Sequence, residues 1–196
     1  MKNPDIIEAM RPIISAFEEH SIAYYVGGSV ASSLYGMARA TMDVDLVADI
    51  KVEHIVPLKS SLEHNYYIDE EMILEAIRRK SSFNLIHLET MIKIDVFIIK
   101  DEPYQSKALE RKRLDTIEEG DAGGKSYFSA PEDIILNKLH WYEIGNRVSE
   151  RQWLDIIGVI KIQGELLDLN YLEQWAKQLQ LWELLEKAYQ DAGISI

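Results

Sequence analysis

Three aspartates in two apolar segments are the residues of this chain best suited to catalysis. Asp43 and Asp45 alternate with apolar residues in Asp43-Val44-Asp45-Leu46-Val47. A β-strand would place both carboxylates on one face, about 7 Å apart. Asp95 interrupts the apolar segment 92–99, where an ionised group is costly without a partner. If the two segments are neighbouring strands, the three carboxylates converge on one site.

Such a convergence predicts divalent-metal chemistry. Mg²⁺ is a hard cation that prefers carboxylate and phosphate oxygens, and it would relieve the repulsion between the three aspartates. Two ions about 4 Å apart are the arrangement that supports in-line phosphoryl transfer. Asp95 would then be a third ligand or the general base that takes a proton from an attacking hydroxyl. For Asp43 and Asp45 alone, a solvated strand face remains the simpler alternative.

A glycine turn precedes these aspartates. Gly27-Gly28-Ser29 lies between the apolar strand expected over 22–26 and a short helix expected over 29–35. Glycines there permit positive φ and close approach of the backbone to a ligand. The free N–H groups at a helix start attract anions, phosphate above all. The structural alternative is an ordinary turn in which Ser29 caps the helix.

The hydrophobic periodicity predicts an α/β (α+β) fold. A small mixed β-sheet flanked by helices is expected over residues 1–130, and a C-terminal helical subdomain over 131–196. Gly36 is expected to end its helix in the left-handed conformation. The remaining strands are expected at 44–50, 66–68, 83–88, 92–99, 114–117 and 126–128, and the remaining helices at 4–20, 53–64, 70–80, 131–144, 149–162, 170–180 and 182–191.

Composition narrows the functional classes. The 196 residues suffice for one domain or a core with an appendage, and 47% of them are hydrophobic. Cysteine is absent, which excludes thiolate catalysis and thiolate zinc sites and fits a reducing cytoplasmic location. No segment has the length and apolarity of a membrane span. The formal net charge of −12 means that any contact with nucleic acid needs a local basic patch.

These motifs together resemble a known superfamily. Gly27-Gly28-Ser29, Asp43-x-Asp45 and the later Asp95 look like the signature of the nucleotidyltransferases related to DNA polymerase β. The longer run through Tyr35-Gly36-x-x-Arg39-x-Thr41 is similar to the branch that includes the AbiEii-type toxins. Ser129-Ala-Pro-Glu-Asp133, Lys138, Arg151 and Asp155 add to that likeness, which spans about residues 22–157.

The resemblance implies a role for each matched residue. Asp43 and Asp45 would be metal ligands, and Asp95 a third ligand or general base, with Mg²⁺ as the cofactor and Mn²⁺ as a substitute. The nucleotide-binding residues would be Gly27, Gly28, Ser29, Arg39, Thr41 and Lys138. The expected enzyme is an NTP-dependent, two-metal nucleotidyltransferase that moves a nucleoside monophosphate to a hydroxyl and releases pyrophosphate.

Plainer interpretations exist for several of these residues. Arg39 would otherwise be a surface salt-bridge partner, and Lys138 a solvated lysine on an amphipathic helix. Arg151 and Asp155 are four residues apart and would form a helix-stabilising pair. His87 and the four tryptophans are expected to be core or helix-packing residues.

The acceptor stays open at this stage. The AbiEii-type likeness points to tRNA or another RNA end, in a toxin–antitoxin pair, and the basic clusters 78–80 and 107–113 are the candidate contacts. Related enzymes that modify aminoglycoside-like antibiotics use an acidic pocket for a cationic substrate, and the net charge of −12 suits such an antibiotic equally well. A protein side-chain hydroxyl on a partner toxin is a third candidate acceptor for the same site. From a different class, the chain would be a catalytically weak nucleotide-binding or antitoxin-like protein that binds a cognate partner. No membrane partner is expected.

Overall fold

Alternating apolar and polar residues give the strands of this protein two distinct faces. In the computed structural model, which describes residues 4–116 and 124–194, the strands form one seven-stranded mixed sheet in the order β3-β4-β5-β2-β1-β7-β6. The strands are β1 (Tyr24–Val26), β2 (Asp43–Ala48), β3 (Tyr66–Tyr67), β4 (Ser82–His87), β5 (Lys93–Ile98), β6 (Arg113–Asp115) and β7 (Ser126–Phe128). The mixed α/β fold class predicted from the sequence is confirmed.

The pairing of β2 with β5 sets the geometry of the sheet centre. These two strands run parallel, with Asp45 opposite Asp95 and Leu46 opposite Val96. β4 is antiparallel to β5, and β1 is antiparallel to β2. Residues that are partners across such ladders point to the same face, so the register decides which side chains meet.

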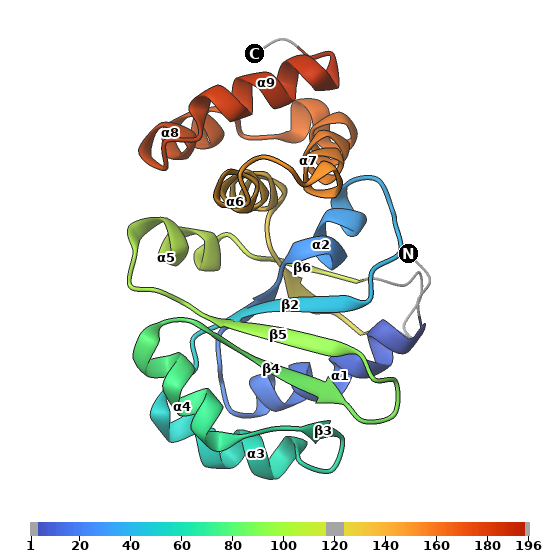
Figure 1. Ribbon diagram of the computed structural model, residues 1–196, viewed down its shortest axis with the longest axis vertical. Helices are drawn as coiled ribbons and strands as arrows, with labels where there is room; N and C mark the ends of the chain where they lie inside the picture. Colours follow the sequence, from blue (N-terminus) through green and yellow to red (C-terminus); the bar gives the residue numbers. More distant parts are fainter. Residues whose placement is uncertain (1–3, 117–123, 195–196) are drawn as a thin grey trace.

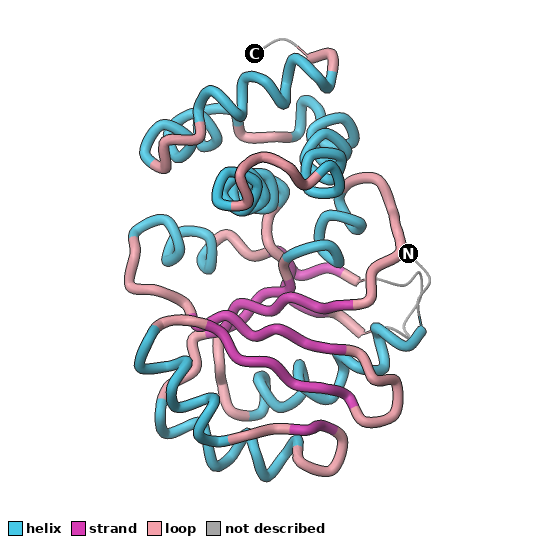
Figure 2. The backbone as a smooth tube through the Cα atoms, in the orientation of Figure 1, coloured by secondary structure: helices cyan, strands magenta, loops and turns pink. Residues whose placement is uncertain are grey.

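Helices cover the two faces of the sheet unequally. α1 (Pro4–Glu19), α3 (Ile55–Leu62) and α4 (Glu70–Arg79) lie on one face. α2 (Gly28–Tyr35) lies on the other, and α6 (Pro131–Ile144) and α7 (Glu150–Gln163) are stacked beyond it with α8 (Leu169–Gln178) and α9 (Trp182–Ala192), as Figure 1 shows. The magenta strands in Figure 2 run between these two groups of cyan helices. α5 (Pro103–Glu110) follows β5 beside α6.

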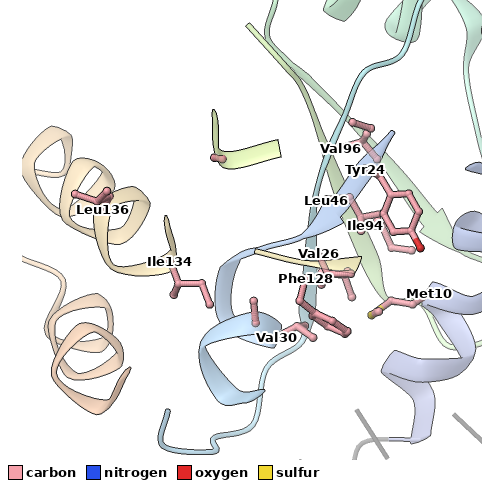
Figure 3. Packing of buried hydrophobic residues seen from close by; sticks show 14 of the residues in the cluster. Met10, Tyr24, Val26, Val30, Leu46, Ile94, Val96, Phe128, Ile134 and Leu136 are labelled. Carbon is pink, nitrogen blue, oxygen red and sulfur yellow. The ribbon is translucent and has the colours of Figure 1, made fainter. Parts of the chain in front are cut away.

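The fully covered face carries the apolar side chains of the central strands. Leu46, Ile94 and Val96 are completely buried, and they gather on the side of the sheet where Met10 of α1 lies (Figure 3). Their neighbours at alternate positions are only half-buried or exposed. The face that carries Asp43, Asp45 and Asp95 is therefore the incompletely covered one.

Several helices begin where local chemistry predicts. Pro4, Pro103 and Pro131 open α1, α5 and α6, where a missing N–H costs nothing. Ser149 caps α7 by accepting a hydrogen bond from the Gln152 N–H, and Asp168 caps α8 in the same way.

The structure corrects some of the expected details. Gly36 has φ −136°, so the expected left-handed conformation is wrong. Gly36 is instead required because a Cβ there would lie 2.8 Å from the Val159 nitrogen, where α2 abuts α7. The single helix expected over 53–64 is a 3₁₀ turn (Val52–His54) followed by α3. α5 was not predicted, since its eight residues carry mixed charges and little periodicity.

Parts of an expected helix start, an expected strand and an expected turn lie outside the described residues. Asn3, expected before the first helix, and Ile117, expected at the end of a strand, are among them, as are residues 120–123 of the expected turn. Within the described ranges, the strand pair itself is present as β6 and β7. No helix in those ranges has the length and apolarity needed to cross a bilayer.

Candidate active site

The three predicted aspartates lie on one face of the sheet. Asp45 and Asp95 are direct partners across the β2–β5 ladder, and Asp43 is one pleat away, opposite Lys93. Asp45 and Asp95 are half-buried, while Asp43, the first residue of β2, is exposed. The shared face expected from the sequence is therefore present, while the convergence of the three carboxylates on one metal site and their catalytic roles stay predictions.

Charge and burial both act on Asp45. Burial and the nearby charges of Asp43 and Asp95 raise the pKa of Asp45 to about 6, and the charges of Lys138 and Lys93 offset part of this rise. The ionised form of Asp45 is costly because the carboxylate is largely buried and its acidic neighbours carry like charge. A divalent cation at this spot would lower that cost.

The glycine turn supports the same carboxylate. Gly28 has φ +54°, and a Cβ on it would lie 1.7 Å from Asp45 Oδ2. The Gly27 N–H donates to the Asp45 carbonyl at 2.8 Å, which attaches the start of α2 to β2. Glycine at 28 is thus required by the approach of an aspartate, which the sequence pattern alone did not indicate.

Two hydrogen bonds hold the outer carboxylates. The Thr41 hydroxyl donates to Asp43 Oδ1 at 2.6 Å, which orients the side chain at the beginning of β2. Lys93 Nζ lies 2.7 Å from Asp95 Oδ2. The structure places Thr41 against Asp43, a predicted metal ligand, and its predicted role as a nucleotide contact stays a prediction.

Asp155 binds both Arg39 and Lys138, and Arg39 also binds Ser29. Arg39 forms a bidentate pair with Asp155 (Nε–Oδ1 2.8 Å, Nη2–Oδ2 2.9 Å) and donates from Nη2 to Ser29 Oγ at 2.5 Å. Lys138 Nζ donates to Asp155 Oδ2 at 2.8 Å. This arrangement gathers two cations next to the start of α2, where the backbone N–H groups also favour an anion.

Arg39 is a partly exposed salt-bridge partner, as its plainer interpretation held, but the plainer interpretations of Lys138 and Asp155 are wrong. Lys138 is buried, with 9% of its side chain exposed, so it is not a solvated lysine. Both carboxylate oxygens of Asp155 are engaged by Arg39 and Lys138, so Asp155 does not serve as the helix partner of Arg151. Burial pushes the pKa of Asp155 up, but the hydrogen bond from Arg39 and the charge of Lys138 outweigh it and hold that pKa below its ordinary value.

Two residues that the sequence did not single out border the aspartates. Asn84 of β4 is the register partner of Asp95, so its amide lies on the same half-buried face. Phe97 of β5 follows Asp95 on that face, and its ring centroid is 6.1 Å from that of Trp141 on α6. The signal for Asn84 was its alternate position in a hairpin strand, which becomes informative only once the register is known.

The aromatic and histidine expectations are largely confirmed. His87 is buried, and its Nδ1 lies 2.9 Å from the Thr90 hydroxyl. Trp153 packs on Tyr142, and Trp175 packs on Tyr104. Trp141 differs because half of its surface is exposed.

The oxygen donors at this site fit Mg²⁺ in kind but are not gathered into a finished metal centre. In the described residues, no group of three or more His, Cys, Asp or Glu side chains stands close enough together to hold a metal ion. The three carboxylates are nevertheless on one face, and burial together with the charges of Asp43 and Asp95 raises the pKa of Asp45. Hard carboxylate oxygens with uncompensated charge are what Mg²⁺ prefers.

Comparisons with known proteins place the fold. A crystal structure of ANT(2'')-Ia in complex with adenylyl-2''-tobramycin superposes with a TM-score of 0.57 at 14% identity, covering 90% of this chain and 97% of that one. The solution structure of the same antibiotic-resistance factor gives a TM-score of 0.54 at 16% identity, covering 91% and 97%. An antigenic nucleotidyltransferase-like protein from Paracoccidioides brasiliensis gives 0.54 at 17% identity, covering 98% and 95%.

Sequence comparisons add nothing to this likeness. No protein-family model matches the chain, and no curated protein sequence matches it. The resemblance noted in the sequence is supported at the level of the superfamily fold, and its AbiEii-type branch is not confirmed. The chain therefore has the nucleotidyltransferase fold.

Proposed function

We propose that this protein transfers a nucleoside monophosphate from an NTP to a hydroxyl acceptor and releases pyrophosphate. One observation carries the proposal: Asp45 and Asp95 are register partners on the incompletely covered face, and the Gly28 backbone lies against the Asp45 carboxylate. This places carboxylates, a helix start and two cations at one position of a nucleotidyltransferase fold.

In the proposed reaction each group of residues has a separate task. Asp43 and Asp45, with Asp95, would hold the divalent ion, which when bound neutralises the triphosphate and stabilises charge as the phosphoryl group transfers. The α2 N-terminus with Ser29, Arg39 and Lys138 would hold the β- and γ-phosphates. Asp95 would take the proton of the acceptor hydroxyl while the acceptor oxygen attacks the α-phosphorus and the bond from that phosphorus to pyrophosphate breaks. Positioning and charge neutralisation supply most of the rate.

The helices of residues 131–196 are assigned to the same reaction. α6 brings Lys138 to Asp155 and to the neighbourhood of Asp45, and it brings Trp141 to Phe97. We propose that this helical part closes over the bound nucleotide, as the sequence resemblance implied.

The charge distribution favours a cationic or neutral acceptor over a long RNA. The expected RNA contacts are largely engaged within the protein: Arg79 pairs with Glu75, Lys80 with Asp101, and Arg111 and Arg113 with Glu132. Lys107 pairs with Glu110, and Lys112 lies over the Tyr127 ring. We therefore propose a hydroxyl on a small cationic molecule as the acceptor, with an RNA end or a protein hydroxyl as the competing outcomes.

A pyrophosphate-release assay tests the proposal. The full chain is incubated with each of the four labelled NTPs and Mg²⁺ or Mn²⁺, with an amino-sugar mixture, total tRNA or a protein extract as acceptor. We expect D45N and D95N to lower the rate at least about 100-fold, since each removes charge stabilisation of the transition state. Asp49 is paired with Lys51 beyond the end of β2, so D49N should stay within about twofold of wild type.

The outcomes separate the candidate functions. Binding of Mg²⁺ and ATP without pyrophosphate release in any arm would support the nucleotide-binding or antitoxin-like alternative. Release that is unaffected by D45N and D95N would overturn the assignment of the aspartates. Label transferred only to tRNA, with strong salt sensitivity, would replace the small-molecule acceptor by RNA and favour the toxin assignment.

A further inference from the structure

A lysine on the face of the three aspartates forms an ion pair with one of them. Lys93 is the first residue of β5, opposite Asp43 and two residues before Asp95, so it projects from the same face as both. Its Nζ lies 2.7 Å from Asp95 Oδ2. No motif in the sequence marked this lysine, because it acquires a role only through the register of β2 with β5.

The interactions of Lys93 extend beyond Asp95. The hydrogen bond to Asp95 raises the pKa of Lys93 above its ordinary value, burial opposes this rise, and the charges of Asp95, Asp43 and Asp45 add to it. The ammonium therefore remains positive at neutral pH and lies in the combined field of the three carboxylates. It supplies one positive charge against three negative ones.

The ion pair between Lys93 and Asp95 is weak enough for a competing cation to break it. About half of the Lys93 side chain is exposed, and exposed pairs contribute only about 0–1 kcal/mol because water screens them. Lysine carries a compact charge on a flexible stem and can leave without rearrangement of the backbone. A divalent ion with several oxygen ligands would outcompete it, especially when a triphosphate supplies further oxygens.

We propose that Lys93 is an internal counter-ion of the aspartates, which a divalent cation must displace from Asp95 before the site is complete. The free protein then holds its carboxylates together without metal, and bare metal ions bind weakly. Metal bound to a nucleotide is favoured because the phosphate oxygens add to the ligand set. This inference rests on the proposed function for the identity of the site, and it adds a residue that regulates metal entry.

Metal titration of the nucleotide-free protein tests this inference. Mn²⁺ alone is titrated into the full-length chain by calorimetry, and the melting temperature is recorded with and without Mn²⁺. We expect K93M to bind Mn²⁺ about twofold to fivefold tighter than wild type, which corresponds to about 0.4–1 kcal/mol. Added Mn²⁺ should also raise the melting temperature of K93M more than that of wild type.

Matched variants separate displacement from a general change in charge. Lys100 has a similar exposure and pairs with Glu102 just after β5, so K100M removes the same charge away from the aspartates and should leave Mn²⁺ affinity unchanged. K93R keeps a cation beside Asp95 and should resemble wild type. D95N combined with K93M should lose the gain, because a carboxylate ligand is missing.

Three results would overturn the proposal. K93M and a second neutral variant, K93Q, could bind Mn²⁺ no better than wild type, or K100M could show the same gain, or the gain could survive D95N. Failure of the proposed function would look different: the metal affinities would follow the expected pattern, and no NTP would yield pyrophosphate.

Discussion

At the scale of single residues, the Gly28 backbone and the Asp45 carboxylate form one unit. The positive φ of Gly28 turns the chain into α2, and the absence of a side chain leaves room for Asp45 Oδ2. The burial of Asp45 that results, together with its charged neighbours, raises the pKa of that carboxyl to about 6. Asp45 is thus held against the part of the chain proposed to receive phosphate.

Substitution of Gly28 by alanine should therefore disrupt the site. The left-handed φ costs a non-glycine residue about 1–2 kcal/mol, and the new Cβ would force Asp45 to move. We expect G28A to lower pyrophosphate release at least about tenfold, as a misplaced catalytic group does, and to lower the melting temperature.

Gly164 provides the control for this prediction. It has φ +47°, and a Cβ there would meet no atom within 4 Å. G164A therefore introduces the backbone strain of a left-handed φ without a steric clash. A G28A protein as active as G164A would show that the contact with Asp45 has no functional consequence.

At the scale of elements, one carboxylate connects segments that are distant in the chain. Asp155 on α7 binds Lys138 from α6 and Arg39 from the loop before β2, and Arg39 in turn binds Ser29 of α2. With 4% of its side chain exposed, Asp155 neutralises two cations that would otherwise repel each other. α7 therefore positions Arg39 and Lys138, two of the proposed phosphate-binding groups.

Replacing Asp155 by asparagine should separate binding from catalysis. Loss of one partner from a buried ionic cluster costs about 3–5 kcal/mol, and the partial exposure of Arg39 places our expectation near about 3 kcal/mol. We expect D155N to raise the KM for the NTP more than it lowers kcat, because Arg39 and Lys138 lose their orientation.

Chemical denaturation and steady-state kinetics measure the two effects. The control is E173Q, which removes an exposed pair with Lys177 on α8 and should change the free energy of unfolding by less than about 0.5 kcal/mol. An unchanged KM in D155N, with a loss of stability alone, would assign Asp155 a purely structural role.

Across the whole molecule, a buried ionic cluster connects α6 and α8 to the segment that follows α5. Glu132 and Asp133 at the start of α6 are almost fully buried, and Arg111 after α5 donates to Glu132 Oε2 at 2.9 Å. Arg111 also lies 3.8 Å from the centre of the Tyr171 ring on α8. Burial, only partly offset by Tyr171 and Arg111, raises the pKa of Asp133 to about 6.

Removal of Arg111 should therefore destabilise the protein in a pH-dependent way. Without this cation the folded-state pKa of Asp133 rises further above its unfolded value near 3.9, so stability is lost as the pH rises through that interval. We expect R111M to cost about 2–3 kcal/mol at pH 7.5 and less at pH 5, where protonation relieves Asp133.

Unfolding free energies at the two pH values check this expectation. K107M, which removes an exposed pair with Glu110 on α5, should cost less than about 0.5 kcal/mol at both. A loss in R111M of equal size at pH 5 and pH 7.5 would mean that contact with Tyr171, rather than charge, is what Arg111 contributes.

Much of the framework was predictable because it depends on neighbours in the chain. The period-two pattern that predicted strands around Asp45 and Asp95 is set within a few residues, and so are the prolines that begin α1 and α6. α5 escaped prediction because its eight residues lack a clear apolar stripe. The left-handed conformation predicted for Gly36 was wrong. A glycine is needed there because α7, more than 100 residues away in the chain, packs against it and leaves no room for a Cβ.

Alternation of polar and apolar residues is set within each strand, so the sequence predicted that Asp43 and Asp45 share a face, and it predicted the glycine turn and the class of sheet with helices. That Asn84 and Lys93 border the aspartates, and that Arg39 and Lys138 share Asp155, is visible only in the folded protein. Strand register and helix contacts depend on the burial of the whole core, which no short segment encodes. The same reason distinguishes Trp141, half-exposed beside Phe97, from the tryptophans that pack between helices.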